Sequence, residues 1–224
     1  MFRVIKLLGG QVEMLVIVSV ATGCAAVLVL FFDTGALPVI GVLPLLSMTA
    51  LSGLAAFPLV AFLYRRGIGG LHALPVTLRG LALLVGAGAV LAVPPIAIDL
   101  FTRFPRDIDV AWPEAVFFYT AIALVAEVQF HLVPLAILTA LAPRRVPVIW
   151  VLLPVVFVEP VAQVVLGAGP VFQMTLVFMN VSLVSAVQIW LFRRYGFAAM
   201  FGLRIAFYLF WHVIWGDIRL SLLF

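Results

Sequence analysis

Residues Pro113–Leu141 read PEAVFFYTAIALVAEVQFHLVPLAILTAL, an apolar run with Glu127 and His131 near its middle. A helix needs about 20 apolar residues to cross the hydrocarbon core of a bilayer, so this run can span it with some tilt. Its apolar residues do not alternate with polar ones, as they would in the strands of a membrane β-barrel. The run therefore predicts a transmembrane helix with a polar centre.

Six more apolar runs of comparable length follow one another along the chain. They are roughly Gln11–Phe32, Leu37–Tyr64, Thr77–Phe101, Val146–Leu166, Phe172–Phe192 and Phe197–Leu220. With the first run they predict an all-α integral membrane protein, a bundle of about seven transmembrane helices. We expect a single domain over residues 1–224, in which residues 1–112 form apolar scaffold helices and residues 113–224 carry the interior polar groups.

The composition excludes most other classes of protein. Of the 224 residues, 66% are hydrophobic and 10% are charged, whereas a soluble domain carries about 25% charged residues. A soluble enzyme, a disordered protein and a coiled coil are therefore excluded, and the single cysteine excludes a secreted disulfide scaffold. The net charge of +4 does not indicate nucleic-acid binding, because the basic residues form no tract. The predicted surroundings are the lipid bilayer of the cell inner (cytoplasmic) membrane, which the chain crosses several times.

The basic residues between the runs predict the orientation, because cytoplasmic loops are enriched in lysine and arginine. With the N-terminus in the cytoplasm, nine basic residues fall on the cytoplasmic side: Arg3, Lys6, Arg65, Arg66, Arg79, Arg144, Arg145, Arg193 and Arg194. Three fall on the other side: Arg103, Arg106 and Arg219. We therefore expect the N-terminus inside and the C-terminus outside.

Each of the last four runs carries polar side chains spaced so that they share one helical face. These side chains are Glu127 and His131; Glu159 and Gln163; Gln173, Asn180 and Gln188; and Arg204, Tyr208 and His212. A charge at the centre of a spanning helix costs about 2.5–3.5 kcal/mol on insertion scales, so we expect the four faces to converge on a common interior. Two interpretations stay open: an ion pair of Arg204 with Glu127 or Glu159 that fixes helix register, or a catalytic or ligand-binding site.

The segment Leu191–Met200, LFRRYGFAAM, resembles the approach to the last conserved motif of the CPBP family, the CAAX-protease and bacteriocin-processing intramembrane proteases. In that family an Arg-Tyr-Gly turn precedes a His by eight residues, then an Asn or Asp, and sometimes a second His. The corresponding residues here are Arg204, Tyr208 and His212. The resemblance covers about the C-terminal half of the chain, from Ala121 to Trp215.

The two earlier motifs of the family resemble this chain only in part. The first is a Glu-Glu pair with an Arg four residues after the second Glu, and the matching residues are Ala126, Glu127 and His131. The second is a Phe followed four residues later by a His, and it resembles Phe157 and Val161. The resemblance implies a site that activates water for peptide hydrolysis inside the membrane. Because Ala126, Val161 and Arg204 stand where Glu, His and His are expected, it also implies a protein without that activity.

We therefore expect a CPBP-like pseudo-protease that acts as a binding, assembly or regulatory subunit, with another membrane protein or a hydrophobic ligand as its partner. Glu127, His131 and Glu159 would be the catalytic residues of the first alternative, an active intramembrane hydrolase with a rearranged site. Asn180, Arg204, Tyr208 and His212 would form the interior polar pocket. A second alternative is a pigment- or cofactor-binding subunit with His131, His212 or His72 as axial ligand. We predict no cofactor. If the protein had one, it would be a metal held by Glu127, His131 and Glu159, or a tetrapyrrole.

Overall fold

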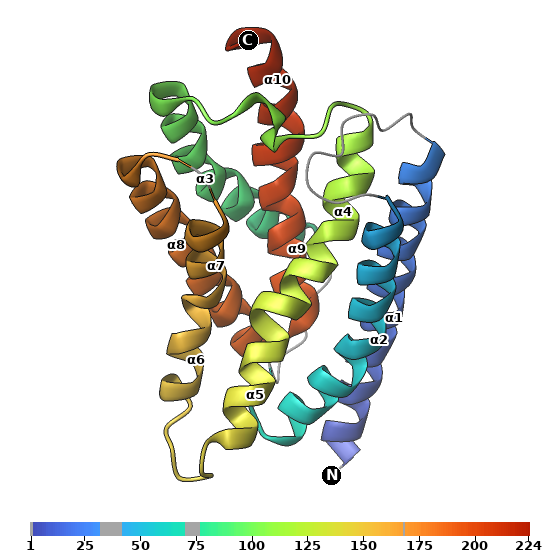
Figure 1. Cartoon of the computed structure of the whole chain (residues 1–224). Helices are drawn as coiled ribbons and strands as arrows, with labels where there is room; N and C mark the ends of the chain where they lie inside the picture. The colour runs from blue at the N-terminus through green and yellow to red at the C-terminus, as the bar shows by residue number, and fades with distance from the viewer. Residues whose placement is uncertain (1, 32–41, 70–76, 168) are drawn as a thin grey trace.

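The computed structural model describes residues 2–31, 42–69, 77–167 and 169–224, and these residues form helices and no strands. The helices of the first half are α1 Phe2–Leu28, the short 3-10 turn η1 Val29–Phe31, α2 Val42–Arg65, α3 Leu78–Thr102, and the 3-10 turn η2 Arg106–Ile108. Those of the second half are α4 Glu114–Ala126, η3 Glu127–Leu132, α5 Val133–Leu141, α6 Ile149–Val156, α7 Val158–Leu166, α8 Val171–Tyr195, α9 Phe197–Tyr208, η4 Leu209–Ile214 and α10 Trp215–Leu222. Figure 1 shows these helices as one bundle.

Six helical stretches of the described chain are long and apolar enough to cross a membrane. They are Pro44–Arg65, Leu78–Thr102, Glu114–Leu141, Ile149–Leu166, Val171–Tyr195 and Phe197–Leu222. The predicted all-α membrane bundle is thus confirmed, and the chain is a multi-pass membrane protein. The first predicted span is present as α1, of which Val12–Leu28 is a shorter apolar helix. The predicted boundaries Phe32 and Leu37, and also His72, lie outside the described residues.

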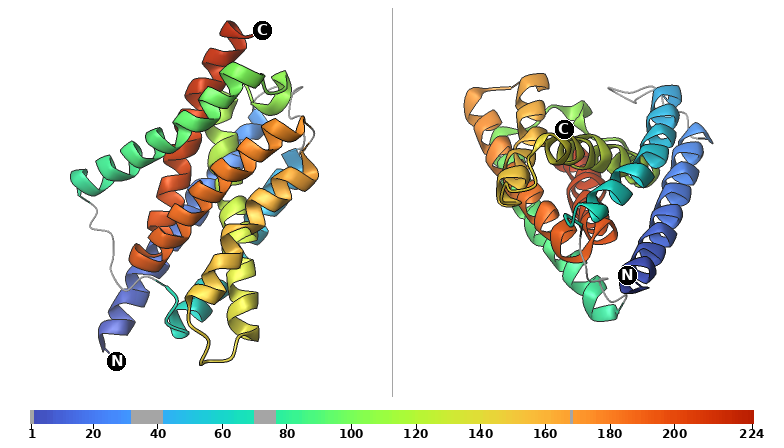
Figure 2. Two further views of the ribbon diagram at one scale, coloured as in Figure 1. Left: turned by 90° about the vertical axis from the view of Figure 1, so that its left-hand side faces the viewer. Right: turned by 90° about the horizontal axis from the view of Figure 1, so that it is seen from below.

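The two spans that carry Glu127 and Arg204 form the middle of the bundle. In the span of α4, η3 and α5, 61% of the most apolar stretch is buried, and in the span of α9, η4 and α10 the share is 50%; the other four spans reach 28–39%. Helix α9 packs against α3, α8, α4 and α1. Helices α1 and α2 lie on one side of the bundle and α6, α7 and α8 on the opposite side (Figure 1 and Figure 2).

The two chain ends lie at opposite ends of the bundle: α1 begins at the bottom of the view in Figure 1, and α10 ends at the top. Helix α1 and the six spans make seven passes along the bundle, and an odd number of passes leaves the two ends apart. Which end faces the cytoplasm stays a prediction from the basic residues.

Two π-helical segments interrupt the central spans. In η3 the backbone N–H of Val133 donates to Val128, five residues back. The next residue, Pro134, has no N–H to donate to the carbonyl of Phe130, so the regular four-residue ladder cannot continue there. Segment η4 makes the same five-residue bond from Trp215 to Phe210. Such π segments occur often at functional sites, and these two carry Glu127, His131 and His212.

The predicted span Val146–Leu166 is divided into α6 and α7 at Phe157. Pro160 cannot donate to the carbonyl of Val156, so the helical ladder breaks at this point. Just before the break, the N–H of Phe157 donates to the carbonyl of Pro154, three residues back, at 3.1 Å. Helix α7 begins at Val158. The break places Glu159 in the first turn of α7, where a carboxylate is favoured by the helix dipole.

Candidate functional site: two buried arginine clusters and a cavity

Arg204 on α9 is the centre of the first cluster, which also contains Glu127, Glu159, Gln188 and Tyr208. Its Nε donates to Glu127 Oε1 at 2.6 Å, and its two terminal nitrogens donate to the carboxylate of Glu159 at 2.9 and 2.7 Å. Further bonds reach the Tyr208 hydroxyl at 3.1 Å and Gln188 Oε1 at 3.2 Å. All five N–H donors of the guanidinium thus have acceptors on the other four residues of the Arg204 cluster. The charge is paired and hydrogen-bonded, as a buried charge requires.

Glu127 has both carboxylate oxygens occupied. Oε1 accepts from Arg204 and from Gln188 Nε2, and Oε2 lies 2.8 Å from His131 Nδ1. Both Glu127 and His131 are 0% exposed. The other ring nitrogen of His131, Nε2, is buried with no hydrogen-bond partner among the described residues.

Arg219 on α10 is the centre of a second cluster, which contains Asp99, Asp109, His212 and Trp215. Its Nε donates to Asp99 Oδ2 at 2.6 Å and a terminal nitrogen donates to Asp99 Oδ1 at 3.0 Å. Asp109 Oδ2 accepts at 3.4 Å, and its other oxygen lies 2.7 Å from His212 Nδ1. The indole N–H of Trp215 donates to Asp99 at 2.8 Å. Arg219 is 0% exposed, so it is a buried structural residue.

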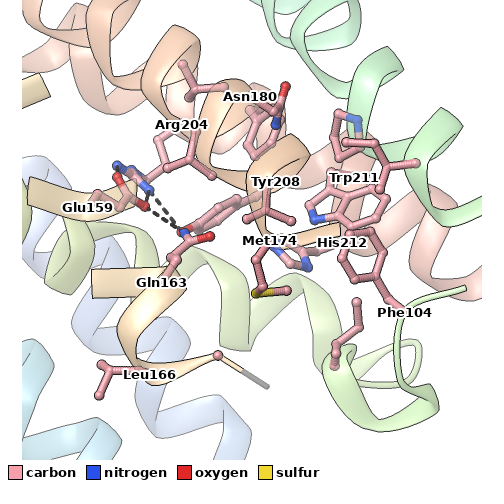
Figure 3. Close-up of a pocket in the computed structure, with 18 of the residues that line it drawn as sticks. Phe104, Glu159, Gln163, Leu166, Met174, Asn180, Arg204, Tyr208, Trp211 and His212 are labelled. Carbon is pink, nitrogen blue, oxygen red and sulfur yellow. Dashed lines mark hydrogen bonds and ion pairs between the residues drawn. The ribbon is translucent and has the colours of Figure 1, made fainter. Parts of the chain in front are cut away.

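A cavity of about 660 Å³ lies between the two clusters. Its walls come from α3, the segment after α3, α7, α8, α9 and η4, and Figure 3 shows part of its lining. Pro95, Ile98, Val177, Val181, Val184 and Phe207 contribute apolar side chains. The exposed residues Pro105, Gln163, Leu166 and Gly167 also line it, so the cavity opens where α7 ends. The volume lies in the range of about 300–1,000 Å³ that is usual for ligand pockets.

The structure divides the candidate residues of the sequence into two groups. Glu159, Asn180, Arg204, Tyr208 and His212 line the cavity. Glu127 and His131 do not line it; they lie behind Arg204, on η3. The four polar faces thus meet in the interior, and Glu127 contacts both His131 and Arg204. Asn180 and Tyr208 belong to the cavity from α8 and α9 (Figure 3).

The proposed metal set of Glu127, His131 and Glu159 is divided by the Arg204 guanidinium, which bonds both carboxylates. Within residues 2–31, 42–69, 77–167 and 169–224, no three His, Cys, Asp or Glu side chains are grouped to hold a metal ion. Of the three histidines considered as axial ligands, His212 is the one that lines the cavity, whereas His72 lies outside the described residues.

The Arg219 cluster was not predicted from the sequence, because Arg219 was counted among the basic residues on the outer side of the membrane. One signal was available: Arg219 follows His212 by seven residues and so continues the polar face of the last span. Counting Arg219 as buried leaves nine basic residues on the predicted cytoplasmic side and two, Arg103 and Arg106, on the other.

Comparison of the chain with protein-family models, curated proteins and solved structures finds no match. The resemblance to the CPBP proteases therefore stays a prediction based on the motif residues.

Proposed function

We propose that this chain is a non-catalytic, CPBP-like membrane protein of the cell inner membrane that binds a hydrophobic ligand in the cavity beside Arg204. The observation that carries the proposal is that the Glu127 carboxylate is fully hydrogen-bonded inside the protein. This is the acidic residue that the motif resemblance assigns to catalysis, and both of its oxygens already have partners.

The position of Glu127 is unfavourable for general-base catalysis. A general base must come within hydrogen-bond reach of the proton that it removes, directly or through one water. Glu127 is fully buried behind Arg204 and does not line the cavity. The arrangement is that of a buried ion cluster that holds η3, α7, α8 and α9 together, which gives the cavity a rigid polar floor.

The cavity itself supports a binding role. It combines apolar walls with a few polar side chains, the usual composition of a small-molecule site. Helix α7, which forms one wall, ends at the mouth with the exposed Val165 and Leu166. Leu166 ends its span and Pro105 lies beyond the end of another, so the mouth opens near one surface of the bilayer, where an apolar molecule would enter from the lipid. A partner membrane protein could be regulated through the same cavity, and it would bind the apolar outer faces of the bundle.

The test combines a hydrolysis assay with a binding assay on the purified protein in mild detergent. We expect no cleavage of a membrane-peptide library by the wild-type protein or by Glu127→Gln. Mass spectrometry of the intact protein should show a co-purifying hydrophobic molecule. Val181→Trp, which fills the cavity, should lose that molecule. Leu183→Trp, on an exposed position of the same helix, is the matched control and should retain it.

Two results would overturn the proposal. Cleavage that disappears in Glu127→Gln, while circular dichroism shows the variant to be folded, would establish an active hydrolase with a rearranged site. Equal retention of the bound molecule by Val181→Trp and Leu183→Trp would show that the cavity is not its site.

A further inference from the structure

Three side chains bring hydrogen-bond donors to the cavity that no described residue accepts. Asn180 on α8 is 7% exposed, and its amide hydrogens have no acceptor among the described residues; its Oδ1 is a buried acceptor that has no donor there. The Tyr208 hydroxyl accepts from Arg204, which leaves its own hydrogen free to donate. The indole N–H of Trp211, a residue 7% exposed, has no acceptor among the described residues. The free hydrogens of these side chains favour a ligand that accepts hydrogen bonds. Asn180 Oδ1 is buried without a partner among the described residues, which costs about 1–3 kcal/mol, so the ligand should also donate one.

The carboxylate acceptor of the cavity wall is already used, whereas Asn180 Oδ1 is not. Glu159 takes two bonds from Arg204 and a third, at 3.4 Å, from Gln163 Nε2. A ligand head group that only donates would therefore find few partners.

His212 adds a group that can exchange a proton. Its Nδ1 lies 2.7 Å from Asp109 Oδ1, and its ring stacks on Tyr119 with ring centres 4.2 Å apart. A carboxylate has no hydrogen to offer, so the hydrogen of this bond is on Nδ1; in the neutral imidazole the second nitrogen, Nε2, is then an acceptor. The ionisable groups that face the ring are Asp109, Tyr119 and Tyr208.

The two arginines leave no positive charge for an anion. Arg204 is bonded to two carboxylates and so is Arg219. A ligand that brought a permanent negative charge would add it to a site surrounded by low-dielectric protein and lipid, where an unpaired charge is costly. A neutral acid avoids this cost.

We infer that the ligand is a long-chain carboxylic acid whose head group lies between Tyr208, Trp211 and His212 and whose chain lies along the apolar walls toward Leu166. The inference rests on the proposed function, since it names the ligand of the same cavity. The acid O–H donates to His212 Nε2; if the proton crosses, the carboxyl O–H bond breaks, an Nε2–H bond forms, and the net charge stays unchanged. The carboxyl oxygens accept from Tyr208 and Trp211.

The test keeps one apolar chain and changes its head group. The protein is placed in phosphatidylcholine nanodiscs, and binding of tritiated oleic acid is measured in competition with methyl oleate and oleylamine. Oleic acid should bind most tightly. Methyl oleate, which accepts but has no acid proton, should bind about tenfold more weakly, the effect expected for the loss of one hydrogen bond. Oleylamine, which donates, should bind most weakly.

Variants then separate the role of each side chain. His212→Gln should bring the affinity for oleic acid down to that for methyl oleate, because glutamine does not exchange the proton. Tyr208→Phe should weaken both ligands by a similar factor. Met179→Leu, an exposed position beside Asn180, is the control and should change neither. Thermal unfolding of each variant shows whether it is folded; if His212→Gln is not, Trp211→Phe, which should weaken both ligands, takes its place.

The outcomes distinguish this inference from the proposed function. Methyl oleate or oleylamine binding as tightly as oleic acid, with both still blocked by Val181→Trp, would overturn the inference and leave the cavity as a hydrophobic site. Absence of binding by every probe, in a protein that also carries no co-purifying molecule, would overturn both.

Discussion

Arg204 Nε and Glu127 Oε1 lie 2.6 Å apart, with 2% and 0% of the two side chains exposed. The bond joins α9 to η3, two elements 77 residues apart in the chain. Because the same guanidinium also bonds Glu159, one side chain determines how α9, η3 and α7 fit together. The Arg204 cluster is thus the structural link between the central helices and the cavity wall.

Glu127→Gln should destabilise the protein strongly. The substitution removes one of two negative charges that oppose Arg204 and breaks a buried ion pair, which costs about 3–5 kcal/mol. Unfolding in detergent, followed by circular dichroism, measures the change. Glu13→Gln, at an exposed position of α1, should leave the transition unchanged. A Glu127→Gln variant as stable as the wild type would show that the pair does not hold the helices together.

Replacing the whole Arg204 cluster should be less harmful than breaking it. Arg204→Met alone leaves Glu127 and Glu159 buried without a counter-charge. The triple variant Arg204→Met, Glu127→Gln, Glu159→Gln carries no buried charge, and apolar or neutral replacement of buried ion pairs is often neutral in stability. We expect the triple variant to unfold at a higher temperature than the single variant. The reverse order would contradict the assignment of the cluster as a unit in which the guanidinium holds both carboxylates.

Asp99→Asn tests the Arg219 cluster. Asp99 accepts from Arg219, from Trp215 and from the backbone N–H of Phe104, so it joins α3, the following segment and α10. Loss of the carboxylate should cost about 3–5 kcal/mol, as for other buried pairs. Asp217→Asn, exposed on α10, is the control. Equal stability of the two variants would mean that Arg219 is held by its bonds to the Phe104 and Pro105 carbonyls without needing Asp99.

The helical bundle and the meeting of the polar faces could be predicted from the sequence because both follow from the bilayer. Spans of sufficient length must be helical to satisfy their own backbone, and a mid-span residue such as Glu127 or Arg204 avoids lipid. Which polar side chains pair with each other depends on how each helix is rotated about its own axis, and the residue spacing does not determine that rotation. For example, the spacing places Asn180 and Gln188 on one face, but Gln188 is the one that contacts Glu127, whereas Asn180 lines the cavity.

The Arg219 cluster and the cavity could not be predicted by the same argument. Asp99 and Arg219 lie near the ends of their spans, where a charge can reach water at little cost, so hydropathy does not indicate that they are buried. The cavity depends on the break at Phe157 and on the π segment η4. Breaks of this kind depend on single backbone bonds, and a hydropathy pattern averages over them.

The orientation of the bundle is tested by a reporter fused after Phe224. The nine-to-two distribution of loop arginines and lysines predicts that the end of α10 faces away from the cytoplasm. A reporter active only outside the cytoplasm should therefore be active there, and a fusion in the 143–147 turn between α5 and α6 should be inactive. The opposite pattern would reverse the bundle and place the mouth of the cavity at the cytoplasmic side.

The close approach of α3 and α9 is tested by two glycines of the same helix. A Cβ added at Gly88 would lie 2.6 Å from Ala206 Cβ and 2.7 Å from the Ala206 backbone, whereas a Cβ at Gly86 would meet nothing within 4 Å. Gly88→Ala should therefore push α3 away from α9, at a cost of about 1–3 kcal/mol for overpacking. Gly86→Ala should be neutral or slightly stabilising, because alanine favours the helix by about 1 kcal/mol.

Thermal unfolding in detergent measures both variants. Because α3 also lines the cavity through Pro95 and Ile98, Gly88→Ala should weaken oleic acid binding while Gly86→Ala leaves it unchanged. Equal stability and equal binding of the two variants would mean that α3 does not pack on α9 through Gly88. In that case the wall of the cavity would have to be supported by the contacts of α3 with α8 and η4.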